Sequence, residues 1–346
     1  SDLMLLLVGL VRTLSRRSTL RMARGVVFIG VVLALVGIVQ KAALGDHAFG
    51  GMRIYGFWQP ENLLTTPFGP YVNKNHFAGW MLMGIPVALS LLMAQVQEAK
   101  ARRRGRGVRG LAVWLSEPEG GRVATYTVAV FLMTFSLVMT GSRSGLVCLA
   151  LVAVGFAVLF ARGSSRRAAF GAAAVALALI VVSLQWAGAD SALQRFAQEP
   201  DALGLRLTIW RTSLEMARQF PVLGTGLNTF GIATVIFEPH GNLHYNEAHN
   251  DYVQLLVEGG LVTLGLAVVA IILVARTVAA RFRAGYDGEE YAWLRAGAVT
   301  GLVAVGLQSM VEFSLQMPGN AVLFVVLLAM AVYTPARLRR DDDRVR

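Results

Sequence analysis

Long apolar stretches constrain this chain more than any other feature of its sequence. A helix that crosses a bilayer needs about 20 mostly apolar residues, because backbone groups inside lipid must be hydrogen-bonded within their own segment. Eight stretches of this kind lie near residues 25–45, 75–95, 123–141, 144–161, 168–187, 250–275, 292–312 and 317–334. A further stretch at 3–11 is too short to span and resembles the end of another span. The sequence therefore predicts an all-α, polytopic membrane helix bundle.

Composition supports this class and excludes others. Hydrophobic residues make up 55% of the chain and charged residues 15%, whereas a soluble domain carries about 25% charged residues. A disordered chain would be poor in apolar residues. Cys148 is the single cysteine, which excludes a disulfide framework and a cysteine-based metal site.

The basic residues predict how the spans are oriented. The chain has 32 Lys and Arg against 21 Asp and Glu, a net charge of +11, which fits nucleic-acid binding, an acidic partner or the cytoplasmic face of a membrane protein. Most of these basic residues fall in alternate connections, at 12–24, 100–122, 162–167, 276–295 and 337–346. Positive residues favour the cytoplasmic side, so the excess indicates topology and no nucleic acid. Membrane lipid headgroups are a lesser interpretation of the Arg-rich segment 100–109.

This topology divides the chain into three parts. Residues 1–187 hold the N-terminal spans, residues 188–249 form a large loop on the outer side, and residues 250–346 hold three C-terminal spans and a basic tail. A connection of this length is more often functional or separately folded than a plain linker. All the histidines fall on the outer side: His47, His76, His240, His244 and His249.

The outer loop is expected to be partly helical. In residues 205–220, apolar side chains recur at helical spacing, at Leu207, Trp210, Leu214 and Ala217. Pro221 would end this helix, which would lie on the membrane surface or cap the bundle.

Arg206 and Arg211 lie in this predicted helix, about 140° apart around its axis. They need not share a face, but a ligand at one end could meet both, and guanidinium groups match phosphate oxygens in two-point contacts. The plainer interpretation is a solvated surface pair, or two arginines that face lipid phosphates.

His249 lies at the start of the 250–275 span, for which Asn246 is the expected N-cap. A helix N-terminus favours a bound anion and a neutral imidazole, which could act as a base. An interfacial histidine with no task is the plainer interpretation. A zinc site made of His240, His244, Glu247 and His249 is a further alternative, against which Pro239 and Gly241 argue because they disfavour a helix there.

Polar residues gather at other outer edges of the predicted spans. Arg143 lies in a hairpin at 141–145 and must find an anion or water, because a lone arginine near hydrocarbon is costly. Further polar side chains near the outer ends of spans are Asn75, His76, Glu258, Gln308 and Glu312. Together these residues predict a cationic, histidine-containing chamber that opens outward.

Several of these segments resemble the signature of the O-antigen ligase superfamily, which includes lipopolysaccharide O-antigen ligases, polysaccharide polymerases and pilin oligosaccharyltransferases. The resemblance extends over about residues 60–265. It rests on Arg206 with Trp210-Arg211, Phe220-Pro221-Val-Leu-Gly224-Thr-Gly226, Ala248-His249-Asn250-Asp251-Tyr252 and Glu258-Gly259-Gly260. The segments 68–79 and 140–145 are similar to earlier parts of the same pattern.

The resemblance implies a GT-C-like glycosyltransferase of the bacterial inner membrane with its active site facing the periplasm. The implied donor is a glycan on undecaprenyl diphosphate, and the acceptor is a hydroxyl of lipid A–core, of another glycan or of a protein. The reaction would invert the anomeric centre without metal or other cofactor. Members of the superfamily have about three more N-terminal spans than this chain, so further spans are expected upstream.

The resemblance also implies roles for individual residues. His249 would be the catalytic base, and Arg206, Arg211 and Arg143 would hold the diphosphate. The expected supporting residues are Asn75, His76, Asn250, Asp251, Tyr252 and Glu258. A flippase or transporter of lipid-linked saccharide is the alternative, although it usually shows repeated halves, which this sequence lacks. A non-catalytic scaffold or sensor would leave the arginine and histidine cluster unexplained.

Overall fold

The computed structural model describes residues 2–44, 54–55, 57–58, 66–102, 117–163, 201–237, 245–284 and 289–333. Within these ranges the chain is helical and contains no strand, only two isolated β-bridges. The helices are α1 (Asp2–Thr13), α2 (Arg16–Leu44), α3 (Lys74–Arg102), α5 (Pro118–Met139), α6 (Arg143–Gly163), α9 (Asp201–Gln219), α10 (Phe230–Phe237), α11 (Asp251–Ala284), α12 (Glu289–Gln308) and α13 (Pro318–Val332), with the 3-10 turn η1 (Ser314–Gln316).

Each predicted span that falls in the described ranges is a helix, which confirms the all-α class for this part of the chain. Four of these helices are long and apolar enough to cross a membrane: Arg16–Ala43, Lys74–Ala99, Pro118–Met139 and Asp251–Arg283. Two shorter apolar helices are Arg143–Gly155 and Pro318–Val332. The predicted span at 168–187 and the basic tail at 337–346 lie outside the described residues, so the count of eight spans stays a prediction.

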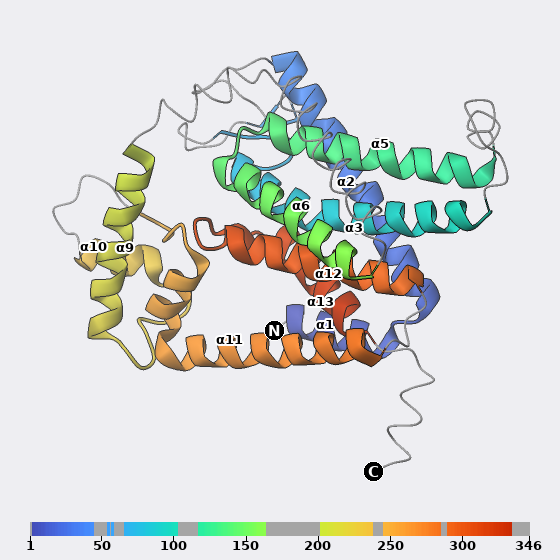
Figure 1. Cartoon of the computed structure of the whole chain (residues 1–346). Coiled ribbons are helices and arrows are strands. Elements are labelled where there is room, and N and C mark those ends of the chain that lie inside the picture. The colour runs from blue at the N-terminus through green and yellow to red at the C-terminus, as the bar shows by residue number, and fades with distance from the viewer. Residues whose placement is uncertain are drawn as a thin grey trace, which may run out of the picture.

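Helix α3 forms the centre of the bundle and packs against α2, α5, α6, α12 and α13 (Figure 1). Its apolar window is buried throughout, as expected for a helix that is hydrophobic on all sides. Two glycines one turn apart bring α12 close to it. A Cβ at Gly297 would come within 2.6 Å of the Pro86 carbonyl oxygen, and one at Gly301 within 2.8 Å of the Met83 oxygen. Small residues at this spacing allow close helix contact in membranes.

A second cluster joins α9, α10 and the loop before α11, and Figure 1 shows these elements together at one end of the molecule. The helix expected at 205–220 is present and ends before Pro221. Within the apolar stripe of this helix, Ala217 is buried, whereas Leu207 and Leu214 are 45% and 46% exposed. The buried face of α9 instead carries Ile209, Ser213 and Met216, since α9 packs against α10 and α11 through this side.

The turn after α9 is inserted into a break in α11. Gly260 has φ of +62° and is not helical, and Gly224 has φ of +68°. The Thr225 N–H donates to the Val257 oxygen at 2.8 Å, and the Leu261 N–H donates to the Pro221 oxygen at 2.9 Å. A Cβ at either glycine would overlap backbone atoms of the opposite segment. These backbone hydrogen bonds form a clamp between the turn after α9 and the break in α11. Gly224 and Gly260 allow this close approach because they carry no Cβ.

Candidate functional site

The outer end of α3 contributes the first side chains of the site. Asn73 caps this helix, with its Oδ1 accepting the Asn75 N–H at 2.8 Å. Asn75 Nδ2 in turn donates to Glu312 Oε1 at 2.8 Å. The expected supporting residues Asn75 and His76 thus lie in the first turn of a buried helix. Asn75 contacts the carboxylate of Glu312, which is distant in sequence.

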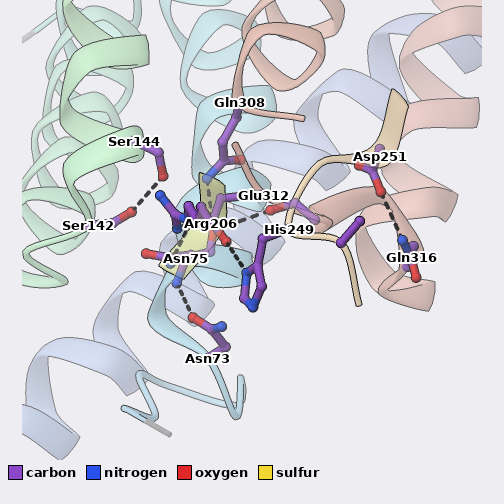
Figure 2. A network of polar contacts seen from close by, with 12 residues as sticks. Asn73, Asn75, Ser142, Ser144, Arg206, His249, Asp251, Gln308, Glu312 and Gln316 are labelled. Atoms are coloured by element: carbon purple, nitrogen blue, oxygen red, sulfur yellow. Dashed lines mark hydrogen bonds and ion pairs between the residues drawn. The ribbon is translucent and has the colours of Figure 1, made fainter. Parts of the chain in front are cut away.

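Glu312 is the centre of the polar network drawn in Figure 2. Its side chain is 1% exposed and forms an ion pair with Arg206 from α9. Its other oxygen lies 3.8 Å from His249 Nδ1. Glu312 was expected inside a span at 292–312, but α12 ends at Gln308 and Glu312 lies in the connection to η1. This connection lets one carboxylate contact residues from α3, α9 and the segment before α11.

His249 precedes α11 in a backbone conformation that non-glycine residues rarely adopt, with φ of +48°. Two hydrogen bonds hold the residue before it in place. Trp210 Nε1 donates to the Ala248 oxygen at 3.0 Å, and the Ala248 N–H donates to Gln254 Oε1 at 3.1 Å. The His249 side chain is 35% exposed, whereas its Nδ1 is buried and faces Glu312. One edge of the imidazole therefore faces the Glu312 carboxylate without a hydrogen bond, and the rest of the ring is accessible.

The N-cap of α11 differs from the expected one. Asn250 Oδ1 accepts the N–H groups of Tyr252 at 3.0 Å and Val253 at 3.1 Å, which is the pattern of a capping side chain. Asn246 was expected in this role, but the helix begins too late for its side chain to cap it. Asn250, an expected supporting residue, thus fixes the start of α11 directly after His249.

His76 packs close to the same centre. Its ring lies 4.5 Å from that of Phe313, and the His249 ring lies 5.0 Å from the same phenyl group. Asn320 Nδ2 donates to the His76 backbone oxygen at 2.9 Å. His76 is 5% exposed, so it forms part of the wall of the site and is much less accessible than His249.

The remaining acidic residues of the site are held by amide side chains. Gln316 Nε2 donates to Asp251 Oδ1 at 3.1 Å, and Gln254 Nε2 donates to Glu247 Oε2 at 2.7 Å. Burial raises the pKa of Glu247 above its usual range, and the hydrogen bond from Gln254 opposes this shift. Glu258 accepts the N–H groups of Asn228 and Phe230 at the start of α10, at 2.9 and 3.2 Å. Glu258 therefore has a structural task, which is to cap α10.

The other expected residues lie around this centre. Arg143 is the first residue of α6, where Ser142 Oγ caps the helix by accepting the Gly145 N–H at 3.2 Å. Arg211 is exposed on α9. Tyr252 donates its hydroxyl to the Gly306 oxygen at 2.8 Å and thereby joins α11 to α12. Of the two arginines of α9 expected at the site, Arg206 is the one that contacts Glu312.

Sequence reasoning noted Glu312 as a polar residue at a membrane edge but gave it no role, and it missed Trp210 and Gln254 as residues that position His249. A carboxylate within an apolar stretch was the available signal for Glu312. The zinc alternative requires His240 and His244, which lie outside the described residues. The described residues alone contain no group of three or more side chains suited to hold a metal.

Comparison with protein families gives a match over residues 128–268 to the family described as O-antigen ligase. This match supports membership of the chain in the O-antigen ligase superfamily. It includes Arg143, Arg206, Arg211, His249 and Glu258, whereas Glu312 lies outside it. A comparison with curated proteins gives no match. The family match and the apolar helices together support a multi-pass membrane protein with a glycosyltransferase-type domain.

Proposed function

We propose that this chain transfers a glycan from undecaprenyl diphosphate to an acceptor hydroxyl, as an O-antigen ligase or a polysaccharide polymerase at the periplasmic face of the inner membrane. The family match supports the general activity. The observation that carries the reaction is the convergence of Arg206 and His249 on the buried carboxylate of Glu312. This arrangement brings a cation and an accessible base to the same point.

His249 would act as the general base. With Nδ1 facing Glu312, the other ring nitrogen, Nε2, takes the proton from the acceptor hydroxyl. The acceptor oxygen forms a bond to the anomeric carbon while the bond from that carbon to the phosphate oxygen breaks, and the configuration inverts. Glu312 then stabilises the imidazolium, as a carboxylate behind a catalytic histidine does in other enzymes.

Arg206 would stabilise the leaving diphosphate. Its ion pair with Glu312 does not exhaust its donors, because a guanidinium carries several N–H groups in a planar fork. The Arg206 side chain is 25% exposed, so it can bridge Glu312 and an anion. Charge that grows on the leaving group is best stabilised by donors that are already in place. Arg143 and Arg211 are proposed to hold the same diphosphate from α6 and from the exposed side of α9.

The supporting residues keep this geometry. Asn75 holds Glu312 from α3, and His76 forms part of the wall near Phe313. Asn250, Asp251 and Tyr252 fix the beginning of α11 behind His249. Lipid A–core, another glycan or a protein would supply the acceptor hydroxyl.

The test is a transfer assay with purified protein in detergent, undecaprenyl-diphosphate-linked glycan as donor and lipid A–core or a glycan as acceptor. We expect a new glycoconjugate from the unchanged chain, none from His249→Ala, and strongly reduced product from Arg206→Ala. Arg218→Ala is the matched control, because Arg218 is exposed on the same helix and pairs with Glu215. Full transfer by the His249 variant would exclude the proposed base. If the protein, once reconstituted into vesicles, moves the donor across the bilayer without forming any product, a flippase would be favoured instead.

A further inference from the structure

Residues 220–237 have a composition unlike that of a solvated loop. This stretch contains no charged residue, whereas the preceding helix α9 carries Asp201, Arg206, Arg211, Glu215 and Arg218. A water-exposed connection of this length would be expected to carry charge. The absence of charge starts where α9 ends and continues through α10.

The apolar side chains of this stretch are turned outward. Leu223 and Leu227 in the turn are each 72% exposed, and Ile232 and Ile236 on α10 are each 71% exposed. The opposite face of α10 is buried through Phe230 and packs in the cluster with α9. Because α10 is apolar on both faces, its outer face needs an apolar environment as well.

The exposed surface continues onto a membrane-spanning helix. The N–H groups of Leu261 and Val262 donate to the oxygens of Pro221 and Val222, at 2.9 and 3.2 Å. Leu261, Val262 and Val222 are 59%, 47% and 60% exposed, so apolar side chains of the turn and of α11 lie side by side. Only 6% of the apolar window of α11 is buried within the molecule, so most of this window needs an apolar environment from outside the described residues.

The contact lies where the composition of α11 changes. At about 1.5 Å per residue, the 34 residues of α11 are longer than a hydrocarbon core of about 30 Å. The acidic residues Asp251 and Glu258 and the amide Gln254 precede the break at Gly260, and residues 261–275 are uncharged. The clamp therefore holds the turn where the apolar part of α11 begins.

We infer that residues 220–237 form a membrane-inserted element, with the turn at 221–227 and the outer face of α10 in the acyl chains of the leaflet beside the candidate site. The element is anchored by the Gly224–Gly260 clamp and by Glu258. It holds α9, with Arg206, at the level of the lipid headgroups. This placement follows from exposure, charge and backbone bonding, and it is independent of the proposed reaction.

The test uses an environment-sensitive fluorophore on single introduced cysteines, in the full chain reconstituted into phosphatidylethanolamine–phosphatidylglycerol vesicles with doxyl-labelled phosphatidylcholine. Cys148 is buried and is replaced by alanine. Leu223→Cys and Ile236→Cys test the element. Leu266→Cys, on the exposed apolar part of α11, is the lipid reference. Arg218→Cys, exposed on α9, is the reference for the headgroup level, which aqueous iodide reaches. Melting temperatures of all the variants confirm that they are folded.

We expect blue-shifted emission and doxyl quenching at Leu223 and Ile236, similar to Leu266, with little quenching by aqueous iodide. Emission like that at Arg218, with strong iodide quenching, would overturn the inference. Blue-shifted emission that neither quencher reduces would also overturn it, since protein would then cover the surface. In that case, disulfide formation between two copies of the unlabelled Ile236→Cys variant would identify the protein that covers this surface as a second copy of the chain.

Discussion

Replacing Glu312 by glutamine tests the site most directly. The variant keeps the shape of the side chain and an amide oxygen for Asn75 and Arg206, and it removes the charge. Breaking a fully buried ion pair costs about 3–5 kcal/mol, because the remaining charge is stranded. Arg206 is 25% exposed, so water can solvate part of its charge, and the retained oxygen still accepts hydrogen bonds. We therefore expect Glu312→Gln to lose about 1–2 kcal/mol of stability and to remain folded.

The expected effect on catalysis is larger than the effect on stability. General-base catalysis contributes about 10²–10⁴ in rate, and a group that positions the base supplies part of this. The distance of 3.8 Å between His249 Nδ1 and Glu312 Oε2 is longer than a hydrogen bond, which favours the lower end of that range. We expect kcat to fall by about 100-fold with little change in the donor KM, because the lost interaction acts mainly in the transition state.

The assay is steady-state transfer with varied donor, together with the melting temperature of each variant. Glu312→Asp, which keeps the charge one methylene further back, should restore part of kcat, and Glu312→Ala should lose the most. Glu215→Gln is the matched control, because Glu215 is an exposed acid of α9 that pairs with Arg218. A folded Glu312→Gln variant with the kcat of the unchanged protein would refute the positioning role.

Three further changes probe the supports of the site. Gly260→Ala should lower the free energy of unfolding by about 2–4 kcal/mol in a thermal unfolding assay, because its Cβ would overlap the Val222 oxygen and the residue has a positive φ. Gly265→Ala is the control, because Gly265 has open space around it, and it should leave the free energy of unfolding unchanged or slightly higher. Trp210→Phe removes the donor to the Ala248 oxygen, and we expect it to lower the free energy of unfolding by about 1 kcal/mol. We expect the transfer rate to fall by more than this loss of stability explains. A transfer rate equal to that of the unchanged protein, at unchanged substrate affinity, would contradict the role of Trp210 in positioning His249. Burial raises the pKa of Glu247 in the folded state, so the folded state binds this proton more tightly than the unfolded state, and stability falls as pH rises through the folded-state pKa. Glu247→Gln should therefore gain melting temperature relative to the unchanged chain as the pH rises above the usual glutamate range of about 4. Melting temperatures that change with pH in parallel for the two proteins would argue against a buried charge at Glu247.

The helices could be predicted because lipid imposes both their length and their composition. Local packing decides where a helix ends within an apolar stretch. The sequence between Gln308 and Glu312 gives little indication that the helix ends there. The expected span at 292–312 therefore placed Glu312 inside a helix, whereas the structure places it in a connection. That difference of one turn decides whether its carboxylate can reach three other elements.

The face of α9 shows a second limit of periodicity. Leu207 and Leu214 share one stripe at helical spacing, and Ile209, Ser213 and Met216 share another. Both patterns satisfy the helical repeat, so the repeat alone does not choose between them. Packing against α10 and α11 selects the second stripe. It also turns Arg206 toward Glu312 and leaves Arg211 exposed, which spacing left open.

The signature residues of the superfamily thus divide into two kinds. Gly224, Gly260 and Glu258 build the clamp that holds the outer loop on α11, and any chemistry that needs this loop geometry would require them. Arg206 and His249 point instead to a carboxylate that lies beyond the matched segment. Motifs in one segment cannot reveal such a partner, because the contact is made across 106 residues of chain. A variant that separates the two kinds is therefore informative: loss of the clamp should lower stability and transfer together, whereas loss of the Glu312 charge should lower transfer in a chain that still folds.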